Sequence, residues 1–292
     1  MRISLSITNF SWPSPGAELR ASLADVARSA DDGGLDTVWV ADHLLQADPN
    51  SSRDDEMLEA YTTLGFLAAQ TRRVRLGTMV TCVTFRPPGM LVKAVTTLDV
   101  LSGGRAWLGL GAGYEQDEAR AMGLSLPPTA ERFERLEETL RLAAQMWAGD
   151  PSPFHGVHYQ LEHPVNSPPP LSKPRPPILI GGMGERKTLR LVARYADACN
   201  LFDIPDGGQT IRRKLDVLAR HCDDLGRDYD SIDKTLSTRL APGETADQFA
   251  DRCSMLATLG IDHAVLITAG PWSAADVDLL CAAAEMVGRS PR

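Results

Sequence analysis

The sequence predicts an α/β protein built as a (β/α)8 barrel, with an insertion around residues 150–177. Short apolar segments without clean alternation recur eight times, as expected for strands that are covered on both faces. Longer amphipathic segments fall between them, and this alternation is typical of a parallel sheet. A doubly wound open sheet has the same alternation and stays the alternative, because counting strands does not prove closure.

The predicted strands are rich in Val, Ile and Leu. They are Ile3–Ile7, Thr37–Ala41, Arg75–Thr81, Ala106–Gly111, Ile178–Gly181, Ala198–Phe202, Thr235–Leu240 and Ala264–Thr268. Among the helices between them, Glu18–Asp32 carries one apolar stripe and ends at two glycines, and Arg132–Trp147 repeats the pattern. With 292 residues, 43% of them hydrophobic, we expect a single domain over residues 1–292.

The insertion reads PSPFHGVHYQLEHPVNSPPPLSKPRPP and lies between the helix ending near Trp147 and the strand at Ile178. Phe154–Leu161 is compatible with a small hairpin. Pro164 to Pro177 is dense in proline and is predicted to be an extended loop. Loops of this length inside a barrel are usually functional segments or lids, so we expect the insertion to border the site.

Composition excludes several classes of function. A net charge of −8 and a pI near 5.3 argue against a general nucleic-acid surface. The five cysteines show no paired spacing and the six histidines no zinc spacing, so neither a disulfide framework nor a metal site is predicted. No signal peptide and no apolar run of membrane-spanning length are visible. We expect a cytoplasmic protein that acts on a small molecule.

In a parallel barrel the active site lies at the C-terminal ends of the strands. The fifth predicted strand ends in Gly181–Gly184, just before Glu185-Arg186-Lys187-Thr188. Glycine amides at the start of a helix favour a phosphate, although an ordinary tight turn has the same sequence.

The fourth strand ends in Gly111-Ala112-Gly113 and lacks the last glycine of a dinucleotide fingerprint, because Tyr114 stands there. These glycines either make room for a flat ring or allow close packing.

Two further strand ends carry polar side chains. His43 is a candidate proton donor whose tautomer Asp42 would set; the alternative is a capping Asp42 beside a solvated histidine. Cys82 alone is more often a small buried hydrophobic residue than a nucleophile.

Taken together, five segments resemble the bacterial luciferase-like superfamily, and most closely its branch that uses coenzyme F420, a deazaflavin. They are WVADHL, RLGTMVTCVTFRPPG, LSGGRAWLGLGAGYEQDEARAMG, ERFERLEETL and ILIGGMGERKTLRLVARYADACN. The resemblance runs in order from Ile3 to about Asn200. It implies a TIM barrel whose inserted segment borders the site.

The resemblance also implies roles for individual residues. Asp42 and His43 would reach ring and substrate, with His43 exchanging the proton and Asp42 orienting it. A non-prolyl cis peptide would join Cys82 to Val83, in a bulge that backs the ring. The residues that would bind the cofactor are Thr81, Cys82, Val83, Leu110, Gly111, Ala112 and Gly113 around the ring, and Gly181, Gly182, Met183 and Gly184 at the phosphate. One departure is Tyr114, with Glu115 next, where several deazaflavin enzymes have a glutamate.

The function implied is hydride transfer between coenzyme F420 and a small organic substrate. The alternatives are a flavin mononucleotide (FMN) monooxygenase and a barrel that binds a flavin without turnover. The polyanionic tail of the deazaflavin needs basic partners, and the candidates are Arg53, Arg86, Arg186 and Lys187. Substrate walls are expected from Phe10, Trp12, the insertion and Trp272. Relatives are often dimers, so we expect a homodimer without nucleic-acid or membrane partners.

Overall fold

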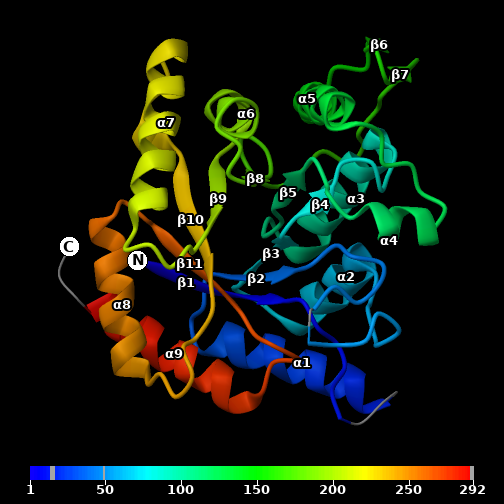
Figure 1. Ribbon diagram of the computed structural model, residues 1–292. Helices are drawn as coiled ribbons and strands as arrows, with labels where there is room; N and C mark the ends of the chain where they lie inside the picture. Colours follow the sequence, from blue (N-terminus) through cyan, green and yellow to red (C-terminus); the bar gives the residue numbers. More distant parts are fainter. Residues whose placement is uncertain (14–16, 49, 290–292) are drawn as a thin grey trace.

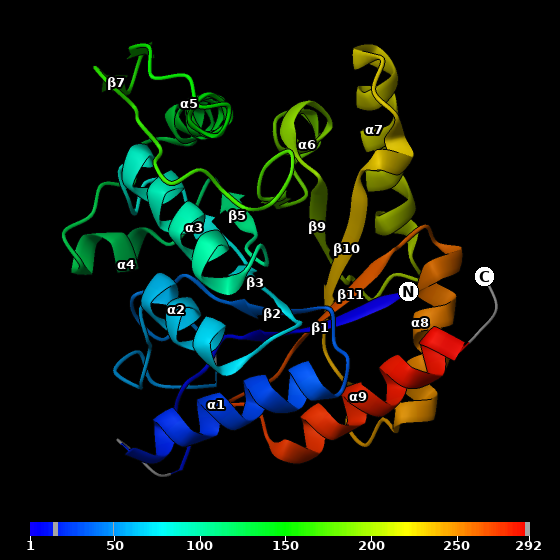
Figure 2. The same cartoon turned by 180° about the vertical axis from the view of Figure 1, so that it is seen from behind.

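One parallel sheet curls into a barrel in the computed structural model, which describes residues 1–13, 17–48 and 50–289 (Figures 1 and 2). The strand order is β3-β2-β1-β11-β10-β9-β8-β5-β4, and every pair of neighbours is parallel. Their bounds are β1 Arg2–Ile7, β2 Thr37–Val40, β3 Arg75–Thr78, β4 Thr81–Cys82, β5 Leu108–Gly111, β8 Ile178–Gly181, β9 Ala198–Phe202, β10 Asp233–Thr238 and β11 His263–Ile267. All eight predicted strand positions are confirmed, with ends shifted by one or two residues in most.

The predicted third strand, Arg75–Thr81, is broken into β3 and β4, so nine segments make an eight-stranded barrel. Closure occurs at the break. Leu76 of β3 forms a parallel bridge to Ala106, its amide donates to Arg105 O at 2.9 Å, and the Trp107 amide donates to Leu76 O at 2.8 Å. The sheet therefore joins both of its edges, and the doubly wound open sheet is rejected.

Helices surround the strands in both views (Figures 1 and 2). They are α1 Ala17–Asp32, α2 Ala60–Gln70, α3 Pro88–Ser102, α4 Gln116–Ala121, α5 Thr129–Trp147, α6 Thr188–Tyr195, α7 Gln209–Leu225, α8 Ala246–Thr258 and α9 Ala274–Arg289, with a 3-10 turn at Tyr229–Ser231. Both helices predicted in detail are confirmed, α5 beginning three residues earlier. Within the described residues, no helix has the length and apolar character needed to cross a membrane.

The insertion forms the predicted hairpin, β6 Phe154–His155 against β7 Gln160–Leu161, followed by an extended loop. Two buried carboxylates hold it on the outside of the barrel. Glu138 of α5 accepts from the amides of Val157 (2.6 Å) and Tyr159 (3.1 Å). Asp99 of α3 accepts from the amides of Leu171 (2.7 Å) and Ser172 (2.9 Å). The hairpin lies beside α5 at the periphery (Figures 1 and 2), so the lid expectation is wrong for this arrangement.

Candidate active site

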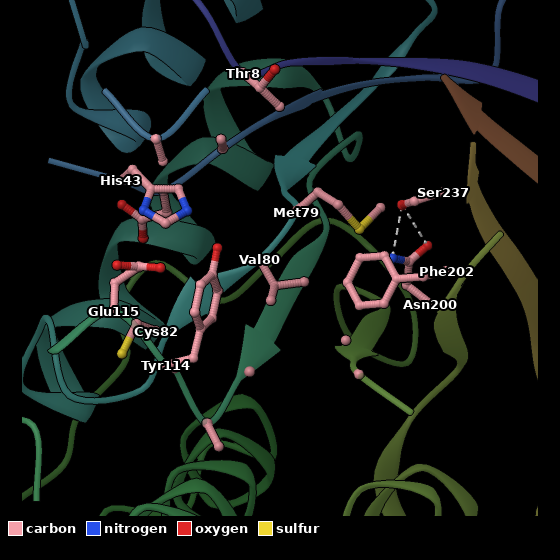
Figure 3. Close-up of a pocket in the computed structure, with 18 of the residues that line it drawn as sticks. Thr8, His43, Met79, Val80, Cys82, Tyr114, Glu115, Asn200, Phe202 and Ser237 are labelled. Carbon is pink, nitrogen blue, oxygen red and sulfur yellow. Dashed lines mark hydrogen bonds between the residues drawn. The ribbon is translucent and has the colours of Figure 1, made fainter. Parts of the chain in front are cut away.

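A cavity of about 420 Å³ opens at the C-terminal ends of the strands (Figure 3). Its lining comes from residues at or just after the ends of β1, β2, β4, β5, β8, β9, β10 and β11, together with the start of α5. The predicted location of the site therefore coincides with this cavity.

The sequence-predicted residues fall into two groups. Those that line the cavity are Asp42, His43, Cys82, Gly111, Ala112, Gly113, Gly181 and Gly182. Those outside the lining are Thr81, Val83, Leu110, Met183 and Gly184. Thr81, Val83 and Leu110 are buried in the barrel wall, and Met183 Sδ accepts from the Phe202 amide at 3.4 Å. The second group can support the walls, but its side chains do not form them.

The bulge at the third strand lies earlier than expected. The cis peptide joins Met79 to Val80, not Cys82 to Val83. The segment reads Met-Val-Thr-Cys-Val-Thr, so two Val-Thr pairs lie three residues apart, and the position that the resemblance implied falls at the second pair instead of the first. Val80 projects into the cavity between the glycines of β5 and β8 (Figure 3). A Cβ on Gly111 would lie 2.8 Å from Val80 Cγ2, and one on Gly181 3.0 Å, so a side chain at either position would press on Val80.

Arg86, which follows the third strand, turns back to bind Asp42. Its guanidinium donates to both Asp42 oxygens, at 2.5 and 2.9 Å, and to Glu59 at 2.5 Å. Burial alone would lower the pKa of Arg86, but the bonds and charges of Asp42 and Glu59 outweigh it and raise that pKa. Both oxygens of Asp42 therefore bind Arg86 and neither binds His43. The expected role of Asp42 in orienting the histidine is corrected, and Arg86 is not available for an anionic cofactor tail.

Glu118, from α4, is the carboxylate that contacts His43 in place of Asp42. His43 Nδ1 lies 2.9 Å from Glu118 Oε2, and Glu118 Oε1 accepts from the amides of Leu44 (2.5 Å) and Leu45 (3.0 Å). Burial raises the pKa of Glu118, but His43 and the two amides outweigh it, so the pKa falls below its usual value. For His43 burial acts to lower the pKa, and the bond and charge of Glu118, then the charges of Glu115 and Asp42, raise it. Both shifts favour the ion pair of imidazolium and carboxylate over the two neutral groups.

Tyr114 and Cys82 stand near this pair (Figure 3). The Tyr114 ring meets the His43 ring edge to face, with centroids 6.1 Å apart, and burial followed by the charges of Glu115 and Glu118 raises the pKa of its phenol. Burial likewise raises the pKa of Cys82, whose Sγ lies 3.3 Å from Thr84 Oγ1. Both groups are therefore protonated at neutral pH, and Cys82 is not an activated nucleophile.

The opposite side of the cavity carries the uncharged polar side chains of Asn200 and Ser237 beside the apolar Met79 and Phe202 (Figure 3). Asn200 Nδ2 donates to Ser237 Oγ at 2.9 Å, and Thr235 Oγ1 donates to Asn200 Oδ1 at 2.8 Å. The expected walls lie elsewhere: Phe10, Trp12, Trp272 and the insertion contribute nothing to the lining. Phe10 and Trp272 belong to the core, where Trp272 Nε1 donates to Ser6 O.

Sequence reasoning missed Glu118 and the pairing of Arg86. Glu118 lies within a segment that carries the family resemblance. The resemblance identifies that segment, but it does not show that Glu118 binds His43. Within the described residues, no group of three or more His, Cys, Asp or Glu side chains is placed to hold a metal.

Comparison with known proteins agrees with this architecture. An F420-dependent glucose-6-phosphate dehydrogenase of Kineococcus radiotolerans is 33% identical over 248 residues, covering 82% of this chain and 69% of that protein. Among solved structures, an F420-dependent secondary alcohol dehydrogenase with an F420–acetone adduct superposes with a TM-score of 0.83 at 18% identity, covering 98% of each chain. Monooxygenase RslO1 from Streptomyces bottropensis gives 0.80 at 17% identity, covering 98% of this chain and 97% of that one. At these identities the two structures show the shared fold. A family model described as luciferase-like monooxygenase matches residues 1–278, and the chain therefore belongs to this family.

Proposed function

We propose that this protein is a coenzyme F420-dependent oxidoreductase that transfers a hydride between the deazaflavin and a small organic substrate. The observation that carries the proposal is the placement of His43, held by Glu118, in the same cavity as the Val80 bulge. The F420-dependent relative at 33% identity supports the choice of cofactor.

The residues present fit a flat ring with a phosphate-bearing tail. Val80 presents a small apolar surface, and the Cα atoms of Gly111 and Gly181 on either side leave room for a ring edge. Gly182, at φ 116°, and Thr188, at the first turn of α6, line the same end and would hold the phosphate. Lys187 lies 5.3 Å above the ring of Phe133, a lining residue, so Lys187 with Arg186 is the best-placed basic pair for the tail.

When bound, the deazaflavin supplies the hydride acceptor or donor. The protein supplies position and a proton site. Because Glu118 fixes Nδ1, the proton is exchanged at Nε2 of His43, which bonds to no other residue in the described part of the chain. Glu118 also stabilises the imidazolium formed when an alcohol loses its proton.

Titration separates the cofactors. Purified protein is mixed with oxidised F420 or with FMN, and quenching of tryptophan fluorescence is followed. We expect tight binding of F420 and at least about tenfold weaker binding of FMN, a difference of about 1.4 kcal/mol. Stronger binding of FMN would move the protein to the monooxygenases. Binding of neither would refute an F420 enzyme.

We also propose a cytoplasmic homodimer. All five cysteines are free, which is typical of a reducing compartment. An apolar groove between α1 and α2, lined by Leu19, Leu58 and Phe66, is a candidate contact surface. Sedimentation equilibrium tests the dimer, and a monomer at micromolar concentration would contradict it.

A further inference from the structure

Carboxylates outnumber basic side chains in the cavity lining. Four carboxylates, those of Asp42, Asp48, Glu115 and Glu118, line it against the single guanidinium of Arg239. The acidic character continues into an adjoining pocket beside His43, which adds Asp117. Arg53 is the one Lys or Arg among the residues lining that pocket.

The partners of these carboxylates decide what a substrate would meet. Asp42 is neutralised by Arg86, and Glu118 is shared with His43. Asp48 accepts from the Gly270 amide at 2.7 Å and the Asn50 amide at 3.0 Å. Burial raises the pKa of Asp48, but these bonds outweigh it, so the pKa is lowered and the group stays charged.

The negative charge of Glu115 is not neutralised by a bonded partner in the described part of the chain. It lines the cavity, is partly exposed, and its side chain makes no hydrogen bond or ion pair to any residue that the structure describes. It lies close enough for its charge to act on both His43 and Tyr114 (Figure 3). Arg239 does little to neutralise the charge of Glu115, because the Arg239 side chain is exposed and its charge acts on Asp48.

An anionic substrate would be poorly served by this lining. Recognition of phosphate or carboxylate uses Arg or Lys donors, often in bidentate pairs. Here an anionic substrate that approaches His43 would meet the carboxylate of Glu115. On the other side of the cavity it would meet the uncharged side chains of Asn200 and Ser237.

We propose that the site takes an uncharged alcohol or ketone and discriminates against phosphorylated and carboxylated substrates. The proposal rests on the proposed function, and it separates this chain from the relatives that are named for glucose 6-phosphate. In oxidation, the alcohol gives its O–H proton to His43 Nε2 and its carbinol hydride to oxidised F420, and a C=O bond forms. The reverse step uses reduced F420 and the protonated histidine.

The test uses matched pairs on the F420-loaded protein: cyclohexanol against 4-hydroxycyclohexanecarboxylate, and glucose against glucose 6-phosphate. Loss of the oxidised cofactor's absorbance gives kcat/KM, and reduced cofactor with the matching ketones covers the other direction. We expect the uncharged member of the cyclohexanol pair to be favoured by at least about tenfold, the effect of one like-charge contact in a partly desolvated site. Higher salt should narrow the difference, because it screens that contact.

Charge reversal at Glu115 sharpens the test. Glu115→Lys should raise the ratio of anionic to uncharged kcat/KM at least about tenfold, with Glu115→Gln intermediate. F420 binding by tryptophan quenching is measured on each variant, so a failed fold or cofactor site is recognised separately.

Three results would overturn the proposal. Preference for the anionic members, with F420 bound, would refute the substrate class and leave the F420 function standing. Bound cofactor without turnover of any uncharged alcohol or ketone would do the same. Failure to bind F420 would remove the proposed function and this inference with it.

Discussion

His43 Nδ1 and Glu118 Oε2 lie 2.9 Å apart although 75 positions separate them in the sequence. The same carboxyl group accepts from the amides of Leu44 and Leu45, so it holds both the ring and the chain that carries it. A carboxylate at Nδ1 keeps the proton on that nitrogen, and a neutral His43 then has Nε2 as its acceptor. This contact fixes the orientation of the ring, and the proposed role of base rests on it.

Removal of the imidazole should therefore affect turnover more than binding. We expect His43→Ala to lower kcat by about 10²–10⁴, the usual contribution of a positioned general acid or base. Affinity for F420 should change by no more than about threefold, since the ring's proposed supports, Val80 and the glycines, are intact. Steady-state kinetics and fluorescence titration measure the two. His158→Ala, on the insertion, is the control, and an equally active His43→Ala would remove His43 from the mechanism.

The raised pKa of His43 sets the pH profile. Alcohol oxidation needs neutral His43, so kcat/KM should rise with pH through a pKa above 6.5. Glu118→Gln removes the charge that raises this pKa, and the rising limb should move to lower pH. Glu115→Gln should move it the same way by less, because its charge makes the smaller contribution. If the rising limb of the pH profile is unchanged in Glu118→Gln, a group other than His43 controls it.

The Arg86–Asp42 pair is predicted to be structural. The Asp42 side chain is fully buried, so Arg86→Met would leave an unpaired charge and cost about 3–5 kcal/mol in the free energy of unfolding. The double variant Asp42→Asn with Arg86→Met removes both charges and should recover most of the loss. Urea unfolding at neutral pH compares the three proteins. A double variant no more stable than Arg86→Met would place the loss in the cation–π contact of Arg86 with Tyr61 instead.

Local patterns predicted the fold better than the site. Most of the buried strands are short runs of Val, Ile and Leu, and the glycines that end β5 and β8 mark the barrel mouth at those two strands. The partner of His43 is not visible in this way, because nothing near residue 43 identifies Glu118. Asp42, adjacent in sequence, was the natural choice, but neighbours near a strand end point in different directions. The bulge was misplaced for a related reason, since Val80-Thr81 and Val83-Thr84 are locally equivalent and only the packing against Gly111 and Gly181 distinguishes them.

The insertion should act on stability more than on catalysis. Glu138 accepts from three consecutive amides, of Val157, His158 and Tyr159. Glu138→Gln replaces one acceptor oxygen with a donor that faces these amides, and we expect a loss of about 1–3 kcal/mol and faster proteolysis within residues 151–177. Glu134→Gln on the same helix is the control: its side chain is 61% exposed and, among the described residues, meets only His158 Nε2 of the insertion, at 2.9 Å, so it should cost less than about 1 kcal/mol. Loss of activity in Glu138→Gln at unchanged stability would contradict the peripheral role.

The contact between Gly111 and Val80 should control cofactor affinity. In Gly111→Ala the new Cβ would lie 2.8 Å from Val80 Cγ2, so the valine must move toward the space proposed for the ring. We expect F420 affinity to fall by at least about tenfold, or about 1.4 kcal/mol. Gly65→Ala in α2 has nothing within 4 Å of the added carbon, and it should leave binding unchanged while stabilising the helix by about 0.5–1 kcal/mol.

Shortening the valine tests the mechanism of that loss. Val80→Ala removes the methyl group that Gly111→Ala would strike, so the double variant should bind F420 more tightly than Gly111→Ala alone and about as tightly as Val80→Ala. Fluorescence titration of the four proteins gives the coupling between the two sites. If the two losses simply add, the steric contact is not how Gly111 acts, and the glycine would be needed for the path of the backbone instead.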